Sequence, residues 1–249
     1  MTKIGIIGGS GLENPDILKN PEKHDVDTPY GRLASPLVSG IINNKSVIML
    51  SRHGWDHTVP PSQVNNRANI RALKEAGCTH ILATTACGSL REEIGRGDLV
   101  IPDQFIDFTH HRIHTFHEHF EPGDMKHKSM ADPFDEGLRN LIISSAKKAG
   151  IEVHPRGTVI TIEGPRFSTR AESRMFRMWG ADIINMSVAP EAILANEAGV
   201  PYAVIAMSTD YDSWKDNEEP VTWEEVLKVF ETNVGRVIEL LKEVISGIW

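Results

Sequence analysis

The sequence predicts an α/β fold in which helices cover both faces of a mainly parallel sheet. Three observations lead to this prediction. Short apolar runs rich in β-branched residues recur along the chain, helical patterns lie between many of them, and three of those patterns end at an Ala-Gly pair. Strands that alternate with helices are typical of parallel sheets, because the crossover helices pack back onto the sheet.

Seven apolar runs have the length and composition of buried strands. In chain order they are residues 3–8, 46–50, 80–85, 98–102, 157–162, 182–186 and 202–207. Four helices are expected between or after them, at residues 63–77, 135–150, 187–199 and 222–245, the last beginning at a Thr222 cap. Residues 105–133 show neither pattern and are expected to be irregular. Since no linker or repeat divides the chain, we expect one domain over residues 1–249.

Composition limits the classes of partner. A net charge of -8 argues against nucleic acid, which needs a basic face, and no apolar run approaches the roughly 20 residues that span a membrane. The N-terminal segment lacks the shape of a signal peptide. The spacing of Cys78 and Cys87 fits neither a CxxC motif nor a disulfide framework. We therefore expect reduced thiols and a cytoplasmic protein.

Polar or small residues follow most of the predicted strands. The segments are GGSG (8–11), SRHG (51–54), TTACGS (84–89), EGPRFS (163–168), NMSV (185–188) and STDYD (208–212). Active sites of parallel sheets gather at the carboxyl ends of the strands, so these segments are expected to meet.

The first three segments together describe an oxyanion site. Glycine amides and the Ser10 hydroxyl are hydrogen-bond donors, the planar fork of Arg52 matches phosphate oxygens, and His53 and Thr85 add further polar groups. Taken singly, each also fits a tight turn or a surface ion pair, and the glycine spacing matches neither a Rossmann fingerprint nor a P-loop.

The later segments suit a purine. Phe167 could stack on a flat heterocycle, and Glu163 or Arg166 could anchor it. Asp210 and Asp212 follow a buried strand, where carboxylates are costly unless paired, and could bind ring nitrogens and an exocyclic amine. Their alternative interpretation is as helix caps or turn formers.

A histidine cluster allows a different class of function. His110, His111, His114, His117 and His119 could in principle bind zinc, and a metal-dependent hydrolase is kept as an alternative. No HExxH motif accompanies them, so solvated or interface histidines are favoured and no metal is expected.

In this order, the motifs resemble the purine nucleoside phosphorylase superfamily, and specifically its methylthioadenosine phosphorylase branch. The likeness runs from IGIIGGSGL through RHG, TTACGSLREEI, GDLVIPDQFID, TIEGPRFSTRAES, WGADIINMS and PEAILANEAG to STDYDSW. It implies one α/β domain with a mixed central sheet, in a homotrimer or a dimer of trimers with sites near the subunit interfaces.

The resemblance also implies roles for individual residues. A phosphate site would be formed by Ser10, Arg52, His53, Thr85, Ala86 through its backbone, and Ser187. Substrate would be bound by Met186 under the ribose, Phe167 and Ser168 beside the base, and Trp223, Val226 and Leu227 around the 5'-alkylthio group, with His127 from a neighbouring subunit. Asp210 and Asp212 would face the N7 and N6 edges of the purine and act in catalysis.

The implied activity is phosphorolysis of methylthioadenosine to adenine and 5-methylthioribose 1-phosphate, with inorganic phosphate as co-substrate and no other cofactor. A protonated Asp210 would make adenine a better leaving group. A phosphorylase of 6-oxopurine nucleosides or of methylthioinosine is the alternative within the family, and it would call for a donor at O6.

Overall fold

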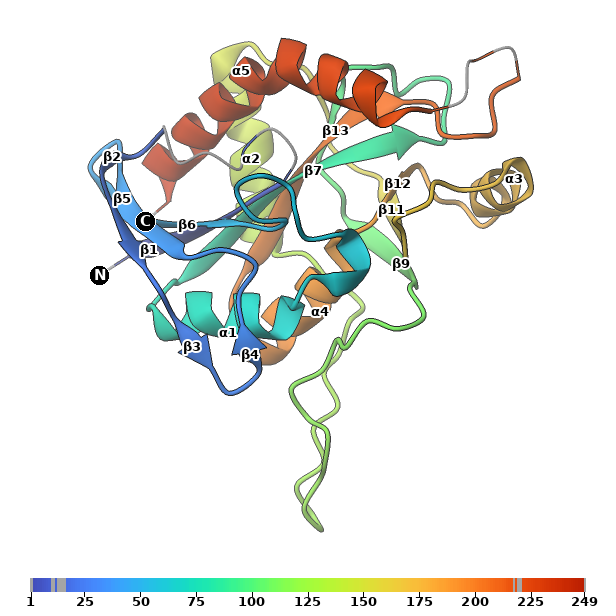
Figure 1. The fold of residues 1–249 in the computed structure, drawn as a ribbon. Coiled ribbons are helices and arrows are strands. Elements are labelled where there is room, and N and C mark those ends of the chain that lie inside the picture. Colours follow the sequence, from blue (N-terminus) through green and yellow to red (C-terminus); the bar gives the residue numbers. More distant parts are fainter. Residues whose placement is uncertain (1, 10–11, 13–16, 217, 219–220, 249) are drawn as a thin grey trace.

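The computed structural model describes residues 2–9, 12, 17–216, 218 and 221–248. One sheet of eleven strands runs through the molecule, with helices on both faces (Figure 1). The strands are β1 (Lys3–Gly8), β2 (Lys19–His24), β5 (Leu37–Ile42), β6 (Lys45–Ser51), β7 (His80–Ser89), β8 (Leu99–Val100), β9 (Gln104–Phe108), β10 (Val153–His154), β11 (Thr158–Ile162), β12 (Ile183–Asn185) and β13 (Tyr202–Asp210). A separate hairpin joins β3 (Asp27–Thr28) to β4 (Gly31–Arg32).

The centre of the sheet is parallel. β7 pairs with β1 on one side and β13 on the other, and β1 pairs with β6, all in parallel. The outer pairs of β2 with β5, β5 with β6 and β13 with β8 are antiparallel, as is β12 with the end of β7. The predicted mixed, mainly parallel sheet is therefore confirmed, and all seven predicted strands are present.

Two pairs of helices cover the two faces of the sheet. The five α-helices of the described residues are α1 (Asn66–Glu75), α2 (Glu136–Ala149), α3 (Arg170–Met178), α4 (Val188–Ala198) and α5 (Trp223–Gly247). Side chains of α2 and α5 share one apolar cluster with alternate strand residues such as Ile6, whereas α1 and α4 share the other with neighbours such as Ile7. This follows from the period of two along a strand, which sends successive side chains to opposite faces. None of the helices in the described part of the chain is long and apolar enough to cross a membrane.

The helix ends follow the expected capping chemistry. Gly150 and Gly199 close α2 and α4 in the left-handed conformation, and the Thr222 side chain accepts a hydrogen bond from the Glu225 amide at the start of α5. The unpredicted helix α3 begins at Thr169 with a capping box to Glu172. That Thr-x-x-Glu spacing is visible in the sequence and could have revealed the helix.

Several strands were not predicted. Every residue of β2 is exposed, so the strand carries no alternation of apolar and polar residues. The expectation that residues 105–133 are irregular is wrong for Phe105–Phe108, which lie in β9 and pair with β11. It holds for residues 109–133, which we call the arm and which extend away from the body of the molecule, drawn in green (Figure 1).

The packing of α5 on the sheet predicts the effect of a truncation. Leu240 is fully buried in the cluster shared with α2. We expect Leu240→Ala to lower the free energy of unfolding by about 2–5 kcal/mol, because it leaves a cavity that the packed strands cannot fill. Urea denaturation measures the change, with Glu239→Ala on the exposed side of the same helix as control. Equal stability of the two variants would contradict this packing.

Candidate active site

One pocket forms where β6, β7, β12 and β13 end and α4 begins. Its lining residues are Arg52, His53, His57, Pro61, Thr85, Ala86, Cys87, Gly88, Ile162, Phe167, Ile184, Asn185, Met186, Ser187, Thr209, Asp210, Asp212, Trp223 and Val226. The pocket thus lies at the edge of the sheet where the strand ends were expected to meet. β7 and β13 extend further than predicted, so the TTACGS segment and the first residues of STDYD lie within strands.

The pocket brings together eleven of the residues singled out from the sequence. They are Arg52, His53, Thr85, Ala86, Phe167, Met186, Ser187, Asp210, Asp212, Trp223 and Val226. Ser168 is buried directly behind Asp212 and hydrogen-bonds to it. Leu227 is half-buried on α5 and is not among the lining residues. Ser10 falls outside the described residues.

His127 does not reach this pocket within one chain. It is exposed on the arm, where its ring packs edge-on against Phe120 and where it borders a separate surface depression.

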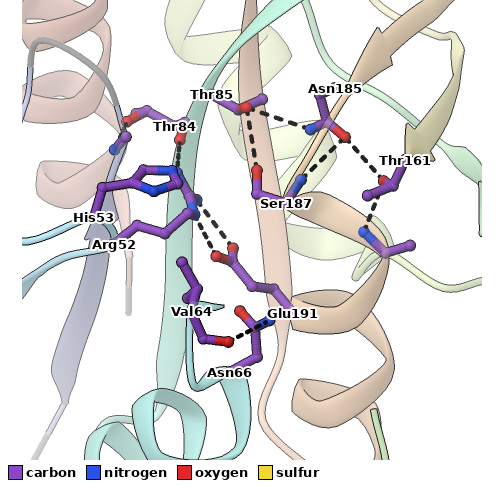
Figure 2. Close-up of polar contacts among 12 residues, drawn as sticks. Arg52, His53, Val64, Asn66, Thr84, Thr85, Thr161, Asn185, Ser187 and Glu191 are labelled. Carbon is purple, nitrogen blue, oxygen red and sulfur yellow. Dashed lines mark hydrogen bonds and ion pairs between the residues drawn. The ribbon is translucent and has the colours of Figure 1, made fainter. Parts of the chain in front are cut away.

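Arg52 lines the pocket and is held in place by a buried ion pair. Its Nε and Nη2 donate to the two carboxylate oxygens of Glu191 at 2.5 and 3.0 Å, and its Nη1 donates to the Thr84 carbonyl at 2.9 Å (Figure 2). Both charged side chains are only 1% exposed. Gly9 leaves room for this guanidinium, since a Cβ at that position would lie 2.6 Å from Arg52 Nη1. Arg52 therefore reaches the site already neutralised by a carboxylate.

His53 is a neutral ring. Its Nδ1 lies 2.8 Å from the Val59 carbonyl, which can only accept, so Nδ1 carries the proton. Burial, and then the adjacent Arg52 charge, lower the pKa of His53 to about 3. Nε2 is therefore a hydrogen-bond acceptor at neutral pH.

Hydroxyl groups and a helix N-terminus form the rest of this end of the pocket. The Thr85 and Ser187 hydroxyls lie 3.3 Å apart, and the Asn185 amide donates to Thr85 Oγ1 at 3.3 Å (Figure 2). Thr161 donates in turn to Asn185 Oδ1 at 2.9 Å. Ser187 precedes α4 without capping it through its side chain. Because a helix N-terminus carries partial positive charge, this end suits an anion.

Asp210 is a buried carboxyl group with a raised pKa. Burial raises the pKa of Asp210 to about 6, although hydrogen bonds from Thr209 and the Asp212 amide oppose the shift. The Thr209 hydroxyl lies 2.8 Å from Asp210 Oδ2 and 3.2 Å from the Cys87 carbonyl. This hydroxyl can donate to ionised Asp210, or accept from protonated Asp210 while donating to Cys87, so it fits both protonation states.

Asp212 occupies an unusual backbone position. Its φ of 45° is left-handed, and its carboxylate oxygens lie 2.9 and 2.8 Å from the Ser168 hydroxyl. A Cβ at Gly88 on β7 would lie 2.8 Å from Asp210 Oδ1 and 3.2 Å from Asp212 Cβ. Glycine at position 88 therefore lets Asp210 and Asp212 lie close to β7.

The prediction that Glu163 or Arg166 anchors the heterocycle is wrong. The Glu163 carboxylate accepts from the His110 and His111 amides and from Arg112, so it fastens the base of the arm. Arg166 forms a two-bond ion pair with Glu172 at 2.7 Å. Each residue is occupied by a structural contact, and neither lines the pocket.

The histidines of the arm are spread out. The His114 ring, for example, hydrogen-bonds the Arg112 carbonyl. Across the described residues, no three His, Cys, Asp or Glu side chains are grouped so that they could hold a metal ion. The zinc hydrolase alternative therefore has no donor set in that part of the chain.

Sequence reasoning missed several residues of the site. Glu191 lies in a predicted helix, but its partner Arg52 is 139 residues away, and no spacing rule reveals such a pair. Asn185 belongs to the NMSV segment and Thr209 to the STDYD segment, but the sequence indicated no role for either residue. The His57 ring stacks on His53 and lies at a tilt against Trp223, with ring centroids 4.4 and 4.8 Å away, and no sequence motif pointed to it.

Comparison with known proteins gives a consistent family. The phosphorylase superfamily matches residues 3–246. S-methyl-5'-thioadenosine phosphorylases from Xenopus tropicalis and Danio rerio are 54% and 52% identical, over 99% of this chain and 89% of theirs. The corresponding protein of the archaeon Thermofilum pendens is 51% identical over 99% of this chain and 92% of its own.

Solved structures agree with the sequence matches. Methylthioadenosine phosphorylase from Schistosoma mansoni in complex with adenine superposes with a TM-score of 0.94, at 43% identity over 99% of this chain and 91% of that one. A mutant of that enzyme in complex with methylthioadenosine gives a TM-score of 0.92 at 42% identity, over the same shares of the two chains.

Proposed function

The chain belongs to the phosphorylase superfamily, and on that premise we infer that it is a pentosyltransferase acting on S-methyl-5'-thioadenosine. Phosphate displaces the base and yields adenine and 5-methylthioribose 1-phosphate. The observation that carries this function is the pocket itself, which joins an anion end at α4 to a buried carboxyl pair at the end of β13.

Phosphate binds at the α4 end. Its donors are the Thr85 and Ser187 hydroxyls, the Ala86 backbone, Arg52 and the helix N-terminus, with Ser10 as a further hydroxyl. His53 Nε2 accepts a hydrogen bond from the P–OH group of hydrogen phosphate and so turns the ionised oxygens toward the other donors and the sugar. No resident cofactor is needed, because these groups already provide positive potential for the anion.

The purine binds at the β13 end. Phe167 stacks on the base, with Ser168 behind Asp212, and Met186 lies under the ribose. As the C1'–N9 bond breaks, its electron pair moves to the purine, and protonated Asp210 donates a proton to N7. A phosphate oxygen forms the new bond to C1'. In the balance of the whole reaction, one proton passes from hydrogen phosphate to the released adenine.

The carboxyl pair favours a 6-amino purine. Asp212 is an acceptor that suits an N6 amine better than an O6 carbonyl. The 5'-methylthio group contacts the apolar side chains of Val226 and Trp223, which line the pocket from α5. A pocket that accepts 6-oxopurines would instead need a donor at the position of Asp212.

The proposed assembly is a homotrimer or a dimer of trimers. His127 lies on the arm and borders a separate depression rather than the pocket of its own chain, which supports the proposal that it belongs to the pocket of a neighbouring subunit. Both cysteines are buried free thiols, which supports the proposed cytoplasmic location.

The direct test of function is release of free base. Methylthioadenosine, methylthioinosine, adenosine and inosine are compared with and without phosphate, by chromatography of the free base. We expect release from methylthioadenosine only when phosphate is present. Preference for the inosine compounds would refute the N6 assignment, and release without phosphate would indicate a hydrolase.

Asp210 predicts a pH dependence. Because the protonated form is the active one and its pKa is about 6, kcat/KM for methylthioadenosine should be level below pH 6 and fall above it. Asp210→Asn keeps an N–H donor at every pH but cannot transfer its proton, so we expect an activity about 100-fold lower without this fall. Rates are measured at saturating phosphate, so that titration of free phosphate does not contribute. If kcat/KM of Asp210→Asn still falls above pH 6, the titrating group is a residue other than Asp210.

The proposed assembly predicts a particle mass and a role for His127. Light scattering should give three or six times the chain mass of 27.7 kDa. His127→Ala should raise KM for methylthioadenosine about tenfold, because it removes a contact to substrate, and leave the particle mass unchanged. A monomer with full activity would refute both expectations.

A further inference from the structure

Arg52 is the only lysine or arginine among the described residues that line the pocket. Its side chain is 1% exposed, so solvent does not screen its charge. Because Glu191 pairs with this charge, the plane in which the guanidinium lies decides which of its N–H groups an anion in the pocket can reach.

Glu191 determines that plane. Its two oxygens accept from two nitrogens of Arg52, in the fork-to-fork geometry that aligns a guanidinium with a carboxylate (Figure 2). Glu191 lies one turn along α4 from Ser187, so the same helix that presents a hydroxyl to the pocket also orients the cation beneath it.

A third donor fixes Glu191 itself. The Tyr202 hydroxyl donates to Glu191 Oε2 at 2.8 Å, and the tyrosine is 1% exposed. Burial and the Glu191 charge raise the pKa of Tyr202 well above its usual range, so the hydroxyl keeps its proton. Tyr202 on β13, Glu191 on α4 and Arg52 after β6 form one buried chain of contacts.

We propose that Glu191 is a positioning residue for phosphate, which fixes the Arg52 guanidinium from below, and that Tyr202 supports it. This inference rests on the proposed function, since it takes phosphate as the occupant of the α4 end. Glu191 touches no reacting atom. It removes the rotational freedom of Arg52 before phosphate arrives, so binding does not have to order that side chain.

The test uses the full chain and measures phosphate binding directly. Isothermal titration with inorganic phosphate is carried out on wild type, Glu191→Gln and Tyr202→Phe, and KM is measured for phosphate and for methylthioadenosine. Asp182→Asn is the matched control, because it breaks the 2.8 Å ion pair with Arg91 outside the pocket. Melting temperatures of all four proteins give the cost to stability.

We expect Glu191→Gln to weaken phosphate binding and raise KM for phosphate at least about tenfold, with KM for methylthioadenosine little changed. Tyr202→Phe should act in the same direction by about threefold. Asp182→Asn should lower the melting temperature and leave phosphate binding unchanged.

Two results would overturn the proposal. Unchanged phosphate affinity in Glu191→Gln and Tyr202→Phe would leave Glu191 a purely structural role, and tighter binding would mean that it acts only by cancelling charge. If Glu191→Gln does not fold, the phosphate affinity of Tyr202→Phe tests the proposal, because this substitution leaves no buried charge unpaired. If the wild-type protein binds phosphate but releases no adenine, the proposed function is refuted. The role of Glu191 in phosphate binding is then still tested by the titration of the variants.

Discussion

The site depends on the buried contact between Arg52 and Glu191. A guanidinium that is 1% exposed is stable only when its charge and its donors are matched, and here a carboxylate and the Thr84 carbonyl match them. The contact ties the loop after β6 to α4 and to β7, three elements from distant parts of the chain. It therefore fixes the relative positions of the elements that supply the anion end of the pocket.

The two ends of the pocket treat charge differently. At the α4 end the arginine is paired and His53 is neutral, so hydroxyls and a helix N-terminus lie beside a compensated cation. At the β13 end, burial raises the pKa of Asp210 to about 6, so this carboxyl group holds a proton to higher pH than an exposed aspartate does. A reaction that places negative charge on a purine and positive charge on a ribose needs both arrangements in one cavity.

Much of the fold could be predicted from local pattern, because buried strands and capped helices have periodic and compositional signals. The runs that became β1, β6 and β13 are mainly apolar, as is typical of central parallel strands. The exposed strand β2 lacks that signal and was missed. Helix α3 was missed for a different reason, since its capping box at Thr169 is present but its apolar face is narrow, with Ser173 and Phe176 as its buried residues.

The sequence by itself determined the order of seven strands and four helices, the family likeness, and the residue types that gather at the strand ends, because these properties depend on composition and short spacing. Only the tertiary structure decided which polar side chains form hydrogen bonds and ion pairs with one another. Glu163 forms an ion pair with Arg112, and Arg166 forms one with Glu172. Glu191, to which the sequence assigned no role, forms an ion pair with Arg52. The physical reason is that hydrogen bonds and pKa values depend on burial and on contacts between residues far apart in the chain, which no local pattern contains.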